Sequence, residues 1–213
     1  MKRTFKITDW GIGVLFTLFF ISIGVILVIN FRPLYECDIN FLDIEVSSGM
    51  TKDVIMENYN ALIDYCSPFF TGELAFPTLA ASETGLFHFK EVKDIFIMFY
   101  WLLPLTGIPL LGIVFYKKKK QDYGYLLPSS LTCIILPIVV SLACMINFDK
   151  TFVIFHKLFF NNDYWIFDPV TDPIIRLLPE EFFLHCAIFI VLIVILGSLT
   201  LFGLSKKFKR KTI

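Results

Sequence analysis

Four long runs without a charged residue constrain the fold of this chain more than any other feature. They cover Trp10–Phe31, Ile95–Tyr116, Tyr123–Phe148 and Phe182–Ser205. Each run reaches the roughly 20 apolar residues that cross a bilayer as a helix, and helices satisfy their own backbone polar groups in lipid. The composition agrees, at 56% hydrophobic residues and a mean hydropathy of +0.72. The sequence therefore predicts an all-α membrane protein with four transmembrane helices.

The charged residues between these runs are separated by sign. The two terminal segments and the loop between the second and third runs hold 12 basic and 2 acidic residues, whereas the other two segments hold 7 basic and 17 acidic residues. The positive-inside rule then predicts that both termini are cytoplasmic. Because this rule explains the basic segments, we expect no nucleic-acid partner. The basic residues are Lys2, Arg3, Lys6, Lys117–Lys120, Lys206, Lys207, Lys209, Arg210 and Lys211.

This topology divides the chain into five parts. We expect a cytoplasmic N-terminus and first helix in 1–31, a small extracytoplasmic cap in 32–94, and the second and third helices with their basic loop in 95–148. A second extracytoplasmic segment covers 149–181, and the fourth helix with a basic tail covers 182–213. The first run is expected to be a retained anchor, since its apolar core is too long for a signal peptide and no small-x-small cleavage site follows.

Short patterns predict secondary structure within the cap. Alternation of apolar and acidic residues over Leu42–Val46 predicts a short strand. The stripe of apolar residues in Thr51–Cys66 predicts a helix, with Ser48 or Thr51 as its N-cap. A disulfide between Cys37 and Cys66 is chemically permitted outside the membrane, but their spacing does not require one. The absence of a CxxC pair argues against metal or redox chemistry.

The second outer segment combines a histidine with many aromatic residues. Asp149 is a predicted N-cap, and helical spacing predicts an amphipathic interfacial helix that carries His156 on its apolar face. The aromatic side chains either form an interfacial belt or wall a dry pocket for acyl chains. They are Phe152, Phe155, Phe159, Phe160, Tyr164, Trp165 and Phe167.

The three histidines all fall near the predicted outer interface. Any one of them alone is explained more readily as a hydrogen-bonded packing residue, and that explanation holds best for His185. His88 and His156, however, lie at matched depth on the two outer segments. Histidine titrates near neutral pH and can take and give a proton, so this pair is our candidate for acid–base chemistry.

Three charged residues near His156 have both ordinary and functional explanations. Asp168 and Asp172 precede prolines, which is usual in turns, and either carboxylate is alternatively a group that orients a histidine. Arg176 either pairs with Asp172 at i+4 or holds a carbonyl or developing oxyanion. Since the chain has no GxSxG, HExxH, phosphate loop or Cys/His metal spacing, two histidines as acid and base are favoured over a covalent or metal mechanism.

Two stretches of the chain resemble one family. The stretch with Phe155-His156, Asn162-Asp163-Tyr164-Trp165-Ile166-Phe167-Asp168-Pro169, Thr171-Asp172-Pro173 and Leu178-Pro179-Glu180-Glu181-Phe182-Phe183 is similar to the lipoprotein intramolecular transacylases of Gram-positive bacteria. The stretch His88-Phe89-Lys90-Glu91-Val92-Lys93 resembles a second family pattern, although Asp is more usual at the position of Glu91.

The resemblance implies a specific acyltransferase. Such enzymes move the sn-2 acyl chain of a diacylglyceryl-cysteine lipoprotein to the α-amino group of the same cysteine, which gives a lyso-form lipoprotein. By match, His88 and His156 are the catalytic residues, at the extracytoplasmic face of a multi-pass cell-membrane protein. Diacylated lipoproteins and membrane lipid are the implied partners, and no cofactor or metal is implied. The supporting candidates are Phe152, Phe155, Trp165, Asp168, Asp172 and Arg176.

Two other functions stay open at the level of sequence. A non-enzymatic membrane partner or assembly protein would tolerate substitution of both histidines and co-purify with a stable partner. An outer-face lipid esterase would use the same histidines but release free fatty acid, and the missing serine motif weighs against it.

Overall fold

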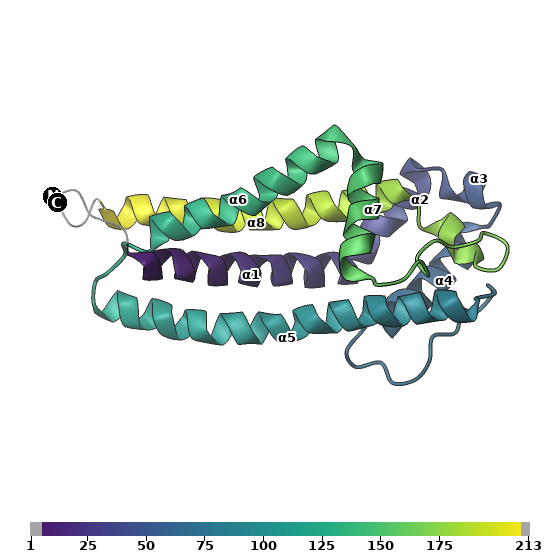
Figure 1. Ribbon diagram of the computed structural model, residues 1–213, viewed down its shortest axis with the longest axis horizontal. Helices are drawn as coiled ribbons and strands as arrows, with labels where there is room; N and C mark the ends of the chain where they lie inside the picture. The colour runs from purple at the N-terminus through teal and green to yellow at the C-terminus, as the bar shows by residue number, and fades with distance from the viewer. Residues whose placement is uncertain (1–5, 210–213) are drawn as a thin grey trace. The chain divides into compact units, whose positions relative to one another are not determined.

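The computed structural model describes residues 6–209 of the chain, and these residues form helices, turns and loops without a strand. Among these residues, four helices are long and apolar enough to cross a membrane: α1 (Ile7–Asn30), α5 (Glu83–Lys119), α6 (Leu126–Ile146) and α8 (Glu180–Lys209), drawn in Figure 1. The prediction of an all-α protein with four transmembrane helices is therefore confirmed. Four residues used in the charge count lie outside the described range, namely Lys2, Arg3, Arg210 and Lys211.

The chain divides into two compact units. One, here called the membrane unit, comprises Met1–Val25, Phe99–Met145 and Ile188–Ile213. The other, here called the cap unit, comprises Ile26–Met98 and Ile146–Ala187, so it contains both segments that the charge pattern places outside. Its shorter helices are α2 (Arg32–Phe41), α3 (Ile44–Ser48), α4 (Lys52–Tyr65), α7 (Phe148–Phe159) and the 3-10 helix η1 (Pro173–Leu177).

Close helix packing in the membrane unit depends on glycines. A Cβ at Gly13 of α1 would collide with Thr132 of α6, and a Cβ at Gly24 would press on Ile190 of α8. Small residues of this kind let helix backbones approach closely in lipid, where packing rather than the hydrophobic effect drives association. Within this unit α1 runs between α5 and α8 (Figure 1).

The core of the cap unit is built around two tyrosines. The rings of Tyr35 on α2 and Tyr59 on α4 stack with centroids 3.6 Å apart, and both are almost fully buried. The hydroxyl of Tyr35 donates to the backbone carbonyl of Leu177 at 2.7 Å, which satisfies the polar end of the ring. Ile174 and Leu177 of η1 are fully buried in the same cluster, so the two outer segments share one core.

The predicted strand at Leu42–Val46 is wrong, because this segment turns into helix α3. Asp43 adopts a left-handed conformation with φ of 50°. This residue separates α2 from α3 and is the N-cap of α3. Ile44 and Ser48 then lie one turn apart, both buried, and the Ser48 hydroxyl donates to the carbonyl of Ile44 at 2.6 Å. An alternation over only five residues does not distinguish a strand from a short helix with one buried edge.

The predicted helix at Thr51–Cys66 is confirmed as α4. Thr51 occupies the N-cap position, but its side chain makes no capping hydrogen bond. The carboxylate of Glu45 instead accepts from the backbone N–H of Lys52 at 2.8 Å, which satisfies an N–H at the start of the helix.

Helix α7 begins earlier than the sequence predicts. Its N-cap is Asn147, whose side chain accepts from the backbone N–H of Lys150 at 2.8 Å, so Asp149 lies in the first turn instead. Asp149 still favours the helix there through the macrodipole. All five cysteines are free thiols, so Cys37 and Cys66 form no disulfide.

Candidate active site

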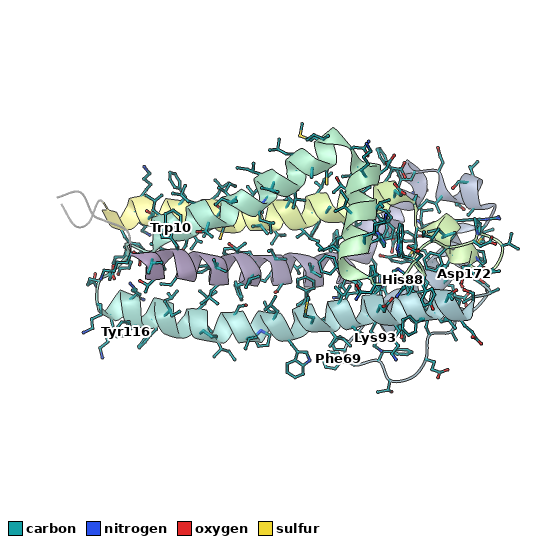
Figure 2. The ribbon with its side chains drawn as sticks, in the orientation of Figure 1. Trp10, Phe69, His88, Lys93, Tyr116 and Asp172 are labelled. Atoms are coloured by element: carbon teal, nitrogen blue, oxygen red, sulfur yellow. The ribbon has the colours of Figure 1, made fainter. Side chains whose placement is uncertain are left out.

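The cap unit brings His88 and His156 together. His88 lies in the second turn of α5 (Figure 2) and His156 lies on α7, and their ring centroids are 6.0 Å apart with an interplanar angle of 33°. The two residues come from the two separate outer segments of the sequence, so this pairing is produced by the tertiary fold. Two imidazoles at this spacing can act on one small group held between them.

Aromatic rings surround both histidines. Trp165 stacks on His156 with centroids 4.6 Å apart, and Phe152 lies 4.2 Å from it one turn earlier on α7. Phe160 packs against both histidines, edge-on to His88 at 4.6 Å and at 5.6 Å from His156. Phe167 lies edge-on to His88 at 5.5 Å. The aromatic rings thus form an apolar enclosure around the two imidazole rings of His88 and His156.

Burial keeps both histidines neutral. The side chains are 4% and 9% exposed for His88 and His156. His88 precedes the uncharged run that begins at Ile95, so it lies outside the membrane-spanning segment. Desolvation, with a smaller effect from the neighbouring His156, lowers the pKa of His88 to about 4. Desolvation also lowers the pKa of His156, against a smaller opposing effect of the Phe152 carbonyl. At neutral pH both rings are therefore free bases.

The hydrogen bonding of His156 fixes which nitrogen carries its proton. Nδ1 lies 2.9 Å from the carbonyl oxygen of Phe152. A carbonyl oxygen can only accept, so Nδ1 is the N–H and Nε2 of the neutral ring holds the lone pair. His88 is different, since its buried Nδ1 has no hydrogen-bond partner in the described part of the chain.

The start of the helix that carries His88, the first turn of α5, is held against the second outer segment. The carboxylate of Asp172 accepts from the backbone N–H of Ser82 at 2.8 Å, and the Ser82 hydroxyl accepts from the N–H of Gly85 at 3.0 Å. Gly85 has no room for a side chain, because a Cβ would collide with Asp172 and press on Phe167. Asp172 and His88 are both labelled in Figure 2. Asp172 thus positions the start of α5.

A second connection follows one turn after His88. The amide nitrogen of Asn162, in the loop after α7, donates to both carboxylate oxygens of Glu91 at 3.0 Å and 3.1 Å. Both residues belong to the motifs quoted from the sequence, but neither motif indicated that they contact each other. This contact joins the elements that carry the two histidines.

Other predicted site residues lie away from the ring cluster. Asp168 is exposed, and its carboxylate accepts from the backbone N–H of Val170 at 2.8 Å, which is the ordinary turn arrangement. Arg176 is exposed on η1 and makes no ion pair within residues 6–209, so the predicted pair with Asp172 does not form. Phe155 is 46% exposed and meets His156 only edge-on, at 5.5 Å.

The third histidine has a partner that the sequence did not reveal. His185 on α8 donates through Nδ1 to the carboxylate of Asp38 on α2, at 2.8 Å and 2.9 Å from its two oxygens. Asp38 is 4% exposed. His185 is therefore a hydrogen-bonded packing residue, as the sequence favours, and its partner is the carboxylate of Asp38. Among residues 6–209 no three His, Cys, Asp or Glu side chains form a cluster that could hold a metal.

Comparison with known proteins points to one family. The family model of the lipoprotein intramolecular transacylase Lit matches residues 10–183. A solved structure of the membrane integral lipoprotein intramolecular transacylase Lit from Bacillus cereus is 39% identical with a TM-score of 0.90, over 96% of this chain and 97% of that chain. A comparison with curated proteins gives no match.

Two further solved structures are variants of the same Bacillus cereus protein, each with one histidine replaced. The variant with arginine has a TM-score of 0.84 over 96% of this chain and 93% of that chain. The variant with alanine has a TM-score of 0.85 over 94% and 91%. Both are 39% identical to this chain.

Proposed function

The chain belongs to the lipoprotein intramolecular transacylase Lit family, and from that membership we propose that it catalyses one particular acyl shift. The sn-2 acyl chain of a diacylglyceryl-cysteine lipoprotein moves to the α-amino group of the same cysteine and leaves a lyso-form lipoprotein. The observation that carries the proposal is the enclosed pair of neutral rings, His88 and His156, 6.0 Å apart.

The reaction needs a base for the attacking amine. An N-terminal amine has a pKa of about 8, so much of it is protonated and non-nucleophilic at neutral pH. The Nδ1–H of His156 is engaged with the Phe152 carbonyl, which leaves the lone pair on Nε2. In our proposal the neutral form of the amine attacks the ester carbonyl carbon, and Nε2 takes the proton that the nitrogen loses as the N–C bond forms.

The departing glycerol oxygen needs a proton in turn. As the tetrahedral intermediate collapses, the bond from the carbonyl carbon to the sn-2 oxygen breaks and that oxygen takes a proton from a ring N–H of His88. His156, now cationic in an apolar enclosure, passes its extra proton to His88, so both rings return to the neutral state. Burial favours this return, because it lowers the pKa of both histidines.

The aromatic enclosure suits a transfer that must avoid water. Attack of the amine on the sn-2 ester closes a ring of about eight atoms, which is entropically unfavourable unless the ends are held together. Water at the same carbonyl would hydrolyse the ester instead, and exclusion of water by Phe152, Phe160 and Trp165 would prevent this side reaction. Neither a cofactor nor a separate acyl donor enters the reaction.

We place the reaction at the extracytoplasmic face of the cell membrane. The support is the charge pattern, since the segments that form the cap unit carry the acidic excess and the remaining segments carry the basic excess. Diacylated lipoproteins and membrane lipid are then the partners of the site.

Mass spectrometry of the N-terminal lipopeptide of a lipoprotein tests the proposal. Cells with this protein should show one acyl chain on nitrogen and one on glycerol, whereas cells without it should not. His88→Ala and His156→Ala should each reduce the shift at least 100-fold. Lys90→Ala and Lys157→Ala, at exposed positions near the two histidines, are the matched controls. Release of free fatty acid without N-acylation would show an esterase and refute the transfer.

A further inference from the structure

Trp165 buries a hydrogen-bond donor that has no partner. Its Nε1 is inaccessible to solvent, and nothing in the described part of the chain accepts from it. An indole N–H is a donor only, and an unsatisfied buried donor costs about 1–3 kcal/mol. Buried tryptophans usually place this group against an acceptor. The unsatisfied N–H of Trp165 lies beside the proposed base, since the Trp165 ring stacks on the His156 ring with centroids 4.6 Å apart.

A second unpartnered polar atom lies in the same cluster. Nδ1 of His88 is also buried without a hydrogen bond among residues 6–209. Among the other described residues of the cap unit, one more buried side-chain atom lacks a partner, Nη1 of Arg32, but Nη2 of the same guanidinium pairs with Asp64 at 2.6 Å. Unsatisfied groups concentrated at one site indicate that a bound molecule supplies the missing partners.

We infer that the Nε1–H of Trp165 donates a hydrogen bond to the carbonyl oxygen of the ester that is attacked, and holds the oxyanion that forms there. This inference rests on the proposed function. The sequence had suggested Arg176 for this role, but that side chain is exposed on η1. A neutral donor also suits this site better, since a buried cation would need its own counter-charge.

The stacking of the two rings explains how the donor and the base act on one ester. A tetrahedral intermediate carries its nitrogen and its oxyanion on the same carbon. The base must therefore reach the nitrogen while a donor reaches the oxygen beside it. Trp165 and His156 lie face to face with an interplanar angle of 29°, so groups at their edges are within reach of neighbouring atoms of one small ligand.

Trp165→Phe tests this role, because phenylalanine keeps an aromatic ring against His156 and removes only the N–H and part of the ring. We expect kcat for the acyl shift to fall about 10–100-fold, with KM changed less than threefold. Trp101→Phe, at a 72% exposed position of α5, is the matched control and should keep wild-type rates. A Trp165→Phe enzyme with kcat within twofold of wild type overturns the inference.

A binding measurement separates this inference from the proposed function. Two lipopeptides with a blocked N-terminal amine are compared, one with ester-linked chains and one with ether-linked chains that have no carbonyl. The wild-type protein in detergent should bind the ester form about tenfold more tightly, and Trp165→Phe should abolish that preference. Equal losses of affinity for both forms would mean that Trp165 only packs, and would overturn the inference. The result does not depend on whether any acyl chain is transferred.

Discussion

The side-chain amide nitrogen of Asn162 donates hydrogen bonds to both carboxylate oxygens of Glu91, at 3.0 Å and 3.1 Å. These bonds join the loop after α7 to the turn of α5 that follows His88. A charged acceptor makes such a contact stronger than a neutral one. We expect Glu91→Ala to lower the rate of acyl transfer at least tenfold, because His88 and His156 lose their relative alignment.

Glu91→Gln keeps one acceptor oxygen for Asn162 and should retain more activity than Glu91→Ala. Asp94→Ala removes an exposed acid one turn further along α5 and is the matched control. The measurement is the transfer rate of purified enzyme in lipid. Equal activity of Glu91→Ala and Asp94→Ala would show that the contact does not position the site.

Gly85 allows α5 to lie against Asp172 and Phe167. Gly85→Ala adds a methyl group where no space exists, so either Asp172 or the first turn of α5 must move. We expect a loss of about 1–3 kcal/mol in stability and at least a tenfold loss of transfer.

Gly112→Ala is the control for this change, since it adds the same methyl group to the same helix in open space. Helix propensity alone predicts that it raises stability by up to about 1 kcal/mol. Thermal unfolding in detergent measures both variants. A Gly85→Ala protein as stable and active as Gly112→Ala would contradict the close packing.

The lowered pKa of His88 predicts that the free energy of unfolding depends on pH in the acidic range. In the unfolded chain the ring binds a proton below about pH 6.5, whereas in the folded protein it stays neutral down to about pH 4. Between these values the unfolded state binds more protons, so stability falls as the pH falls. For His88 this amounts to on the order of 3 kcal/mol.

His88→Gln should therefore unfold with a flatter dependence on pH than wild type between pH 7 and 4. Unfolding midpoints of the two proteins in the same detergent give the comparison, and His156→Gln should flatten the profile in the same sense. Parallel profiles of wild type and His88→Gln would show that His88 is not desolvated in the fold.

The pair of Asp38 and His185 predicts a purely structural effect. Asp38→Ala removes the acceptor of a buried hydrogen bond between α2 and α8, which should cost about 1–3 kcal/mol of stability. Transfer per folded molecule should stay within twofold of wild type. A tenfold loss of transfer in a protein of unchanged stability would instead place this pair in the chemistry.

The four spans were predictable because each depends only on a local run of uncharged residues. The pairing of His88 with His156 was suggested by their matched depth, and their family motifs supported it. The short helix α3 was not predictable, because Leu42–Val46, which lead into it, alternate as a strand does, and the left-handed Asp43 before it has no clear local signal.

The supporting contacts were less predictable than the histidines. Asp38 and His185 are 147 positions apart and lie in no motif, so only the fold brings them together. Asp172 was singled out as a partner of a histidine or of Arg176, yet its carboxylate bonds Ser82 because the chain turns back onto the start of α5. Local spacing constrains neighbours on one helix, and it does not constrain which surface that helix meets.

Helix α7 has apolar side chains on both its faces, with His156 buried on one and Ile154 and Leu158 65% and 75% exposed on the other. Contact with lipid would bury the exposed apolar side chains of such a helix. Under the proposed function the substrate is a lipoprotein held in the membrane by its acyl chains, so its effective concentration at His156 is set by its mole fraction among the membrane lipids. Diluting the enzyme and substrate with inert lipid should slow the reaction in proportion, whereas adding buffer to the same vesicles should leave the rate unchanged.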